Sequence, residues 1–476
     1  NAGKTVYQDE NEFGEAAGVE KTLKTAAEKY ADNETITALA KTVSEQWAEY
    51  QANPTGYFDS VELMELDTMV GGKGINDPEL VETLCSNSAD AIDWLDEHGI
   101  TLHNVASFGG ASVKRIHRPV DADGKTISVG SYMIPLLQEN CEKAGVQILL
   151  NTTANEILTD ANGAACGVKA TGASGETVTV NAKAVVLTSG GFGANLDMVV
   201  KYKPELKGFM TTNAPGILGQ GIEMATAIGA GTVDMDQIQI HPTVEANTAA
   251  LITEGLRGDG AILVNADGKR FFNESGTYEN ILHADEYQKG HCHYTLFDAN
   301  WPEQTKQFKM HGCSRVHPFE NGADPNILWS VFAEKMLPGL IEKGFVVKAD
   351  TIEELARKLG LPEKTLKATV ERYNTLAQNG KDEDYGKEPH RLAALTKAPF
   401  YGAKNTGYIL CTMDGIRIDT TMNAIDTDGN PIPGLYVIGN DSGGFFANTY
   451  PNLATGVACG RTVTFGRLVG KHLAKA

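Results

Sequence analysis

Positive charge is scarce in this sequence. Against 61 Asp and Glu residues there are only 41 Lys and Arg residues, which gives a formal net charge of -20. A chain this acidic repels a nucleic-acid backbone, so we expect no general binding of DNA or RNA, although local basic sites remain open. Long apolar runs are also missing, and we therefore expect no membrane-spanning helix.

Cysteine is sparse and scattered. The seven residues include no C-x-x-C pair, so neither a disulfide framework nor an iron-sulfur cluster is indicated, and reduced thiols are expected. A secretory signal is missing too, because the opening "NAGKTVYQDE" has none of its features and resembles a chain already cut. We expect a soluble protein, in the cytoplasm or exported by a signal upstream of Asn1.

Helical patterns are plentiful. A chain of 476 residues is too long for one ordinary core, so two domains are expected. Asp77 can cap a helix that has Pro78 in its first turn and runs with a helical apolar period until Gly99. Further helices are predicted within 219–231 and, as a pair, within 351–379.

Strand patterns alternate with these helices. "GVQILLN" follows a predicted helix and is predicted to be a strand, as are "GAACGVKAT" and "ETVTVNAKAVVL". The last of these runs into Ser189, Gly190 and Gly191, where main chain can approach a large ligand closely. "LYVIGNDSGG" repeats the pattern of a strand followed by a glycine loop, and a final helix follows. The sequence therefore predicts an α/β core.

Six ordered motifs carry a resemblance to a known family. They are "GGKGINDPELV", "GGASVKRIHRP", "AVVLTSGGF", "QIHPT", "ITEGLRGDGAILVNADGKRFFNE" and "GLYVIGNDSGG". Together they resemble the flavoproteins that comprise soluble fumarate reductases, urocanate reductases and 3-ketosteroid dehydrogenases. The resemblance implies FAD as cofactor and an α/β fold, with a Rossmann-like FAD-binding domain at 1–244 and 401–476. An α+β capping domain would be inserted at 245–400.

One part of that family is not in this sequence. The family opens with a strand, a G-x-G-x-x-G turn and a helix that hold the FAD pyrophosphate. We expect this fingerprint to lie on residues outside the chain. Supply by another polypeptide, or loss of cofactor binding, are the alternatives.

The remaining cofactor residues are implied by the resemblance. Gly190, Gly191 and Phe192 would lie by the adenine side of FAD. The second glycine loop would lie by the ribityl chain and pyrophosphate, with Asn440 where the family usually has Glu. The residues of this second group are Asn440, Asp441, Ser442, Gly443, Gly444 and Leu453.

The resemblance also implies a chemistry of hydride transfer. In the fumarate-reducing branch the flavin passes hydride to one alkene carbon, an arginine protonates the other, and His and Arg side chains polarise the carboxylates. His241 of "QIHPT" matches this scheme, as do Glu254 and Arg257 of "ITEGLRG" in the proton relay.

Three positions depart from that scheme. Tyr278 stands where the family has its proton-donating arginine, Cys411 replaces a histidine, and the arginine that clamps a carboxylate is replaced around Tyr450. Each lost charge-assisted bond is worth about 1.5 to 3 kcal/mol, so fumarate itself is not the expected substrate.

The replacements favour an uncharged carbonyl substrate. Tyr278 and Tyr450 resemble the tyrosines of the ketosteroid branch, and a neutral phenol can deliver a proton or donate to a developing enolate oxygen. We expect Tyr278 to transfer the proton and Tyr450 to hold the carbonyl together with the main-chain amide of Ala454. Phe108 and Cys411 would also contact the substrate.

Structural interpretations of these residues remain open. A tyrosine in an apolar stretch is often a core residue with a satisfied hydroxyl, Glu254 and Arg257 could form an ion pair between domains, and His241 could simply pack. The histidines and cysteine of "HCHYTLF" and "MHGCSRVH" invite a metal interpretation. We expect no metal site, because alternate residues of a strand project to opposite faces.

The predicted function is flavin-dependent reduction of a carbon-carbon double bond conjugated to a carbonyl, on an enone, a steroid-like ketone or an aryl-acrylate. The alternatives are dehydrogenation of a 3-ketosteroid, urocanate- or fumarate-type reduction, and flavin binding without turnover. A haem, an FMN domain or a reduced carrier is the expected electron donor.

Overall fold

The computed structural model describes most of the chain. The described residues are 18–54, 58–106, 111–122, 127–247, 260–274, 289–301, 303, 316–317, 327–328, 337–446, 450–454 and 456–475. Phe108, Glu254, Arg257 and Tyr278 lie outside them, so the roles of these four residues stay predictions.

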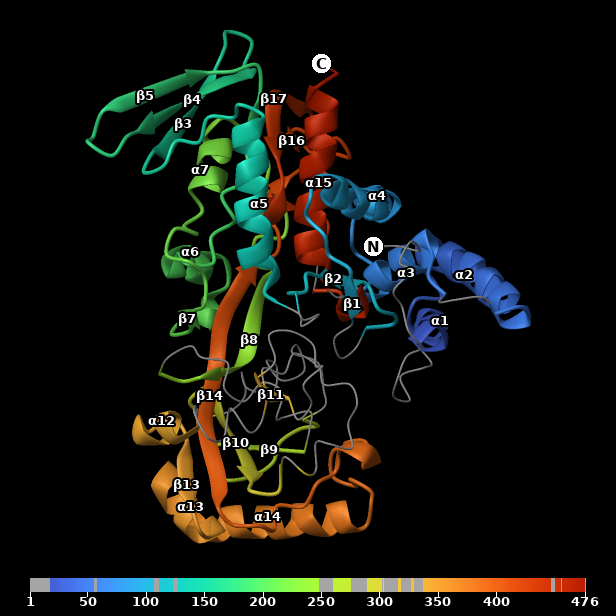
Figure 1. Cartoon of the computed structure of the whole chain (residues 1–476), viewed down its shortest axis with the longest axis vertical. Helices are drawn as coiled ribbons and strands as arrows, with labels where there is room; N and C mark the ends of the chain where they lie inside the picture. The colour runs from blue at the N-terminus through green and yellow to red at the C-terminus, as the bar shows by residue number, and fades with distance from the viewer. Residues whose placement is uncertain are drawn as a thin grey trace.

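Four helices open the described part of the chain and extend to the right in Figure 1. They are α1 (Gly18–Lys29), α2 (Glu34–Ala52), α3 (Val61–Gly71) and α4 (Pro78–Glu97). The α4 helix begins as predicted, because the Asp77 carboxylate accepts hydrogen bonds from the main-chain N–H groups of Glu79 (3.0 Å) and Leu80 (3.3 Å). Leu80 and Leu84 on its apolar face are buried in the main core.

A small mixed sheet of three strands forms the centre of the upper half. Strand β6 (Val185–Leu187) runs parallel to β17 (Pro431–Val437), and β16 (Asn423–Ile425) pairs antiparallel with the other edge of β17. Helix α15 (Val457–Leu473) follows the glycine loop after β17, as predicted. Other elements of this half are α5 (Val129–Lys143), β3 (Thr153–Thr159), β4 (Ala165–Thr171), β5 (Thr177–Asn181), α6 (Leu196–Tyr202) and α7 (Gln220–Ala227).

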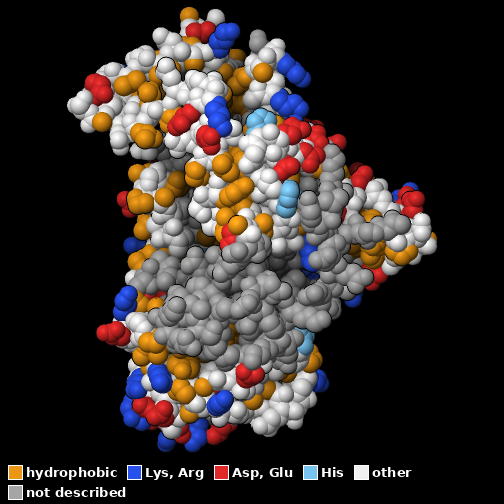
Figure 2. Space-filling model, viewed as in Figure 1, with side chains coloured by type: hydrophobic (Ala, Val, Ile, Leu, Met, Phe, Trp, Pro, Cys, Tyr) orange, Lys and Arg blue, Asp and Glu red, His pale blue; other side chains and the backbone are white. Residues whose placement is uncertain are grey.

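One predicted strand does not form. Residues 146–151, "VQILLN", follow α5 without entering any sheet, and Leu150 is 78% exposed. A strand needs a neighbour to pair with, and residues 146–151 pair with none of the described strands. Figure 2 shows hydrophobic side chains at the surface of this upper half, where Ile134 of α5 is 58% exposed.

One long strand links the two halves of the molecule. Strand β14 (Phe400–Thr412) pairs along its first half with β10 (Cys292–Asp298) and β13 (Val347–Ala349). Its second half pairs with β8 (Ile238–Glu245) and β7 (Met210–Thr211), so β14 runs from the lower to the upper half (Figure 1). The predicted domain limits at 244/245 and 400/401 fall at the end of β8 and the start of β14, and they stay predictions.

Two helices cover the lower sheet. Helix α13 (Ile352–Leu359) packs on α14 (Glu363–Gln378) and on β14, and both helices fall in the predicted interval. The α13 cap differs slightly from a capping box: Thr351 accepts from the N–H of Glu354 (3.1 Å), but the Glu354 carboxylate accepts from Asp350 (3.0 Å). Charged side chains line this lower edge in Figure 2.

Short elements complete the described chain. They are β1 (Asn104–Ala106), β2 (Ile116–Arg118), β9 (Ile262–Val264), β11 (Val316–His317), β12 (Ile327–Leu328), α12 (Leu337–Glu342), β15 (Ile416–Arg417) and β18 (Ser442–Gly443). None of the helices within the described ranges is long and apolar enough to cross a bilayer.

Candidate flavin and substrate site

The two predicted glycine loops meet at the carboxyl ends of β6 and β17. The buried Asp441 carboxylate accepts hydrogen bonds from the N–H groups of Ser189, Gly190 (3.2 Å) and Gly191 (2.9 Å), and from the Ser189 hydroxyl (3.0 Å). Successive main-chain N–H groups form an anion nest. Here the protein's own carboxylate fills the nest, so Asp441 and Gly191 hold the loops together.

A polar recess lies beside this junction. It has a volume of about 290 Å³, and its lining includes Gly190 of the first loop, Gly439 and Asn440 of the second, and Cys459 of α15. Gly190 and Gly439 have left-handed φ angles of 93° and 64°, so bare main chain faces the recess. The end of parallel strands, beside the start of a helix, is where open α/β sheets bind phosphate groups.

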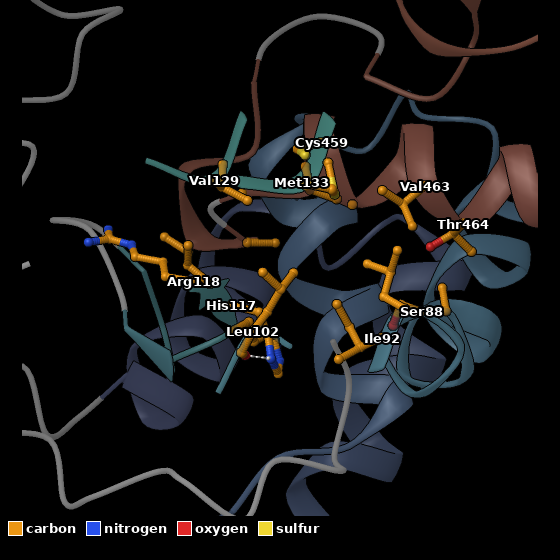
Figure 3. Close-up of a pocket in the computed structure, with 18 of the residues that line it drawn as sticks. Ser88, Ile92, Leu102, His117, Arg118, Val129, Met133, Cys459, Val463 and Thr464 are labelled. Carbon is orange, nitrogen blue, oxygen red and sulfur yellow. Dashed lines mark hydrogen bonds between the residues drawn. The ribbon is translucent and has the colours of Figure 1, made fainter. Parts of the chain in front are cut away.

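An apolar cavity of about 350 Å³ lies against the same part of α15 (Figure 3). Ile92 of α4, Val129 and Met133 of α5 and Val463 of α15 contribute to its lining. Cys459 lines both hollows. The His117 ring bonds through Nδ1 to the Leu102 carbonyl (3.2 Å), and burial lowers its pKa to about 3, which leaves it neutral.

The residues around these hollows fit a cofactor that combines phosphates with flat rings. No carboxylate side chain lines either hollow among the described residues, whereas Arg115, His117 and Arg118 border the apolar one. The polar recess beside the start of α15 suits phosphate, and the apolar cavity suits a ring system.

Tyr450 lies at the start of α15. Its hydroxyl oxygen accepts a hydrogen bond from the N–H of Ala458 (3.4 Å), in the first turn of that helix. Within the described ranges the O–H proton has no hydrogen-bond acceptor. Burial raises the pKa of Tyr450 to about 12, and the Cys411 thiol adds to the rise, so the phenol is neutral at pH 7.

Cys411 and His241 lie on the paired strands β14 and β8. The Cys411 thiol donates to the Gln239 amide oxygen (3.4 Å), and burial raises its pKa to about 12, so it is no thiolate. His241 follows Gln239 by two residues on β8, is buried, and lies opposite Tyr408 of β14. The structure thus brings Tyr450 and Cys411 within electrostatic reach and places His241 on the adjoining strand.

Several predicted ligand-binding residues are engaged within the protein instead. Phe192 is fully buried, and its N–H donates to the Thr412 hydroxyl (3.3 Å). The Ser442 hydroxyl donates to the Gly439 carbonyl (2.8 Å). A Cβ on Gly443 would lie 2.7 Å from the nitrogen of Gly415. These contacts hold the loop in shape. The cofactor-binding roles of the three residues stay predictions.

The loop before α15 is likewise engaged. The Ala454 N–H, predicted to bind the substrate ketone, donates to the Pro451 carbonyl (2.9 Å) in this structure. The Leu453 carbonyl accepts from the N–H of Ser112 (3.1 Å). Ala454 still contacts the apolar cavity, which it lines.

The sequence interpretation missed a buried cation. Arg461 of α15 is fully buried, and its Nη2 donates to the Gly439 carbonyl (2.8 Å). Its Nε and Nη1 atoms have no hydrogen-bond partner among the described residues. Burial lowers its pKa to about 10. The signal was present, because Arg461 stands four residues from Val457 and from Phe465, on the apolar face of the predicted helix.

A buried carboxyl group accompanies this cation. Asp414 accepts from the N–H of Gly444 (2.7 Å) through Oδ1, and its Oδ2 has no partner in the described part of the chain. Burial raises its pKa to about 7, against a lowering influence of Arg461.

The histidine cluster gives no metal site in the described residues. His293 is buried in β10, and His291 precedes that strand with a left-handed φ of 48°. No group of three or more potential ligands that could hold a metal occurs in the ranges that the structure covers. His311 and Cys313 lie outside those ranges.

The parallel pair β6 and β17, with glycine loops and hollows at its carboxyl ends, is typical of a nucleotide-binding α/β protein. Comparison with protein families narrows the class: residues 18–457 match the model described as "FAD binding domain". The chain therefore belongs to that family, and the predicted cofactor, FAD, and the predicted fold class are confirmed.

Curated relatives agree with this assignment. The chain is 37% identical over 420 residues to an NADH:fumarate oxidoreductase of Klebsiella pneumoniae, covering 88% of this chain and 41% of that protein. It is 36% identical over 417 residues to a fumarate reductase (cytochrome) of Shewanella frigidimarina, covering 88% and 66%. The chain thus spans less than two thirds of the length of either relative.

Solved structures agree as well. A flavocytochrome c3 fumarate reductase in its open conformation matches with a TM-score of 0.71 and 31% identity, covering 90% of this chain and 69% of that one. A 3-ketosteroid-Δ4-(5α)-dehydrogenase from Rhodococcus jostii RHA1 shares the fold, with a TM-score of 0.65 and 24% identity, covering 88% and 85%. The predicted resemblance to both branches is confirmed.

Proposed function

We propose that this chain is the substrate-reducing part of an FAD-dependent oxidoreductase, and that it saturates a carbon-carbon double bond conjugated to a carbonyl. The arrangement at Tyr450 carries the proposal. Its oxygen accepts from the first turn of α15, and no acceptor for its proton lies among the described residues. A phenol polarised in this way is suited to a carbonyl oxygen on which negative charge develops.

The two hollows that share Cys459 would hold the cofactor. Gly190, Gly439 and Asn440 would contact its phosphate-bearing part, and the apolar cavity would take a ring. When bound, reduced FAD supplies a hydride to one carbon of the double bond. Tyr450 orients the substrate by its carbonyl oxygen, and Tyr278, whose position rests on the sequence, delivers the proton to the other carbon.

An uncharged enone suits these groups better than a dicarboxylate. Tyr450 and Cys411 are both neutral, because burial raises their pKa values to about 12. The nearby cation, Arg461, lies against the Phe446 ring, and its one hydrogen bond within the described residues goes to Gly439. Unsaturated acids, of which fumarate is an example among the relatives' names, are the alternative substrate class.

An external electron donor completes the proposal. The relatives' names include both NADH and cytochrome, and those relatives are longer than this chain. A haem protein, an FMN domain or a nicotinamide-linked carrier would therefore reduce the flavin.

Reoxidation of the reduced flavoprotein tests the activity. The protein is loaded with FAD, reduced without oxygen, and mixed with benzylideneacetone, cinnamate or fumarate. The flavin absorbance at about 450 nm is then followed. We expect the enone to restore the absorbance fastest and fumarate slowest. Fumarate acting faster than the enone would overturn the substrate class, and no recovery with any of the three would overturn the activity.

Cys459 tests the location of the cofactor separately. This thiol is exposed and lines both hollows. We expect FAD to slow its alkylation by iodoacetamide and to leave Cys141 of α5, the control thiol, unchanged. Equal protection of both thiols, or of neither, would contradict this location.

A further inference from the structure

Arg461 and Tyr450 are joined through one aromatic ring. The guanidinium carbon of Arg461 lies 4.5 Å from the centre of the Phe446 ring. On the Tyr450 side, the Phe446 and Tyr450 rings stack with centres 5.3 Å apart and an angle of 27° between their planes. Helix α15 contacts Tyr450 a second time, through the Ala458 N–H that bonds to the phenol.

Arg461 makes few polar contacts for a buried cation. It is fully buried, makes no salt bridge in the described part of the chain, and has two N–H-bearing nitrogens without a partner there. Removing a cation from water is costly unless it is paired. Stacking on an aromatic face is a compensation that remains, since cations are attracted to the electron-rich face of a ring.

We propose that Arg461 is a positioning residue for Tyr450: it packs on the Phe446 ring, which stacks against the phenol ring, and so holds that ring in place. This proposal rests on the proposed role of Tyr450 as the carbonyl donor. The Tyr450 hydroxyl must point at the substrate within a fraction of an ångström to be effective. The Arg461–Phe446–Tyr450 stack fixes the plane of the phenol, and the Ala458 N–H fixes its oxygen.

The ionisation of Tyr450 and that of Arg461 each depend on the groups around them. The groups that act on the phenol are the Cys411 thiol, which opposes its ionisation, and the first-turn N–H groups of α15, which favour it. In return, the phenol favours the charged form of Arg461, as do Asp414 and Cys411. The role proposed for Arg461 therefore rests on the packing of the three side chains.

The test uses fluorine NMR of the complete chain carrying 3-fluorotyrosine at position 450 only. Arg461→Met removes the charge and keeps the length of the side chain, and Arg461→Lys keeps the charge. We expect one narrow resonance for the parent protein and for Arg461→Lys, and a broadened or split resonance for Arg461→Met. A 3-fluorotyrosine at Tyr436 of β17, in a second sample, is the control and should stay the same in all three.

Superimposable Tyr450 resonances in the parent protein and Arg461→Met would overturn the proposal. An equal change at Tyr436 would also overturn it, because it would indicate general loosening of the fold. The measurement needs neither FAD nor substrate, so it stands even if the proposed reaction fails.

A kinetic measurement links the inference to function. In the FAD-loaded protein, Arg461→Met should raise KM for benzylideneacetone about twofold to thirtyfold, the range expected for a cation–π contact, and change kcat less. A fall in kcat at constant KM would contradict positioning. Absence of enone turnover in the parent protein would count against the proposed function alone. The fluorine resonances would still show whether Arg461 positions the Tyr450 ring.

Discussion

Two buried arginines show how differently the two halves of the molecule treat the same side chain. In the lower half, Arg270 binds Glu274 through two bonds of 2.8 Å and Asp382 through two bonds of 2.9 and 3.4 Å. It also lies over the Tyr373 ring at 4.8 Å. In the upper half, Arg461 has one hydrogen bond within the described residues, to a carbonyl. Its guanidinium carbon lies 4.5 Å from the centre of the Phe446 ring and 5.4 Å from that of Phe445.

The difference separates a structural group from a functional one. Partners raise the pKa of Arg270, whereas burial lowers that of Arg461 to about 10. A buried charge with every bond satisfied gives a fixed structure, whereas an incompletely satisfied one marks a place where the fold accepts a cost. Arg461 bears that cost next to Tyr450, where the proposed chemistry takes place.

The largest effect is expected when Arg270 is substituted, and it is on the free energy of unfolding. Arg270→Met removes the guanidinium that Glu274 and Asp382 share and leaves Glu274 with Lys387 at 3.5 Å. Loss of one side of a buried pair costs about 3 to 5 kcal/mol. Urea denaturation should show a fall of this size in the free energy of unfolding. Arg461→Met should change it by less than about 1 kcal/mol. Equal losses for the two variants would remove the distinction between them.

The buried carboxyl beside Arg461 should make stability depend on pH. The pKa of Asp414 is raised from 3.8 to about 7, so the folded protein holds this proton more tightly than the unfolded chain. The contribution to stability is complete below pH 3.8 and is lost as the pH rises to about 7. Asp414→Asn keeps an oxygen for the Gly444 N–H and removes the titration.

Thermal unfolding at several pH values measures this effect. The Asn variant should gain stability relative to the parent protein as the pH rises from 4 to about 7, in line with the raised pKa. A constant difference between the two proteins across this range would show that Asp414 keeps an ordinary pKa.

The predicted capping domain should contribute Tyr278, the proposed proton donor. If this phenol delivers the proton, Tyr278→Phe should slow turnover by a factor on the order of 10² and leave the protein yellow, because the cofactor site is untouched. Steady-state kinetics and the flavin spectrum measure both. Unchanged turnover would remove Tyr278 from the mechanism.

The smallest effect is expected for Tyr450, on the affinity for the enone. Tyr450→Phe removes one hydrogen bond to a neutral carbonyl and should weaken binding of the enone by about 1 kcal/mol, which is about fivefold in Kd. Titration of the oxidised FAD protein with benzylideneacetone gives this constant. An affinity equal to that of the parent protein would exclude Tyr450 as the carbonyl donor.

Much of the fold follows from local sequence patterns. The α4 helix is correct because Asp77 and Pro78 act on their own neighbours, and β17 is correct because an apolar run ends in a glycine loop. The segment 146–151 has an equally apolar pattern but forms no strand. A strand depends on a partner distant in sequence, and local patterns do not reveal whether that partner is present.

The site was less predictable for a related reason. The resemblance located the glycine loops, yet Gly191 and Asp441 bind each other and Phe192 is buried. Which atoms of a loop are already satisfied is a property of the packed structure. Arg461 was overlooked because a charge on the apolar face of a predicted helix gains meaning only when Phe446 and Tyr450 are seen against it.

The most direct test of the account is the carbonyl stretching frequency of a bound enone. Difference infrared spectra of ¹³C=O-labelled benzylideneacetone in the oxidised FAD protein report the hydrogen bond to its oxygen. We predict a lower frequency in the parent protein than in Tyr450→Phe, because only the parent has a phenol to donate. The same frequency in both would contradict the assignment of Tyr450 as the group that polarises the substrate.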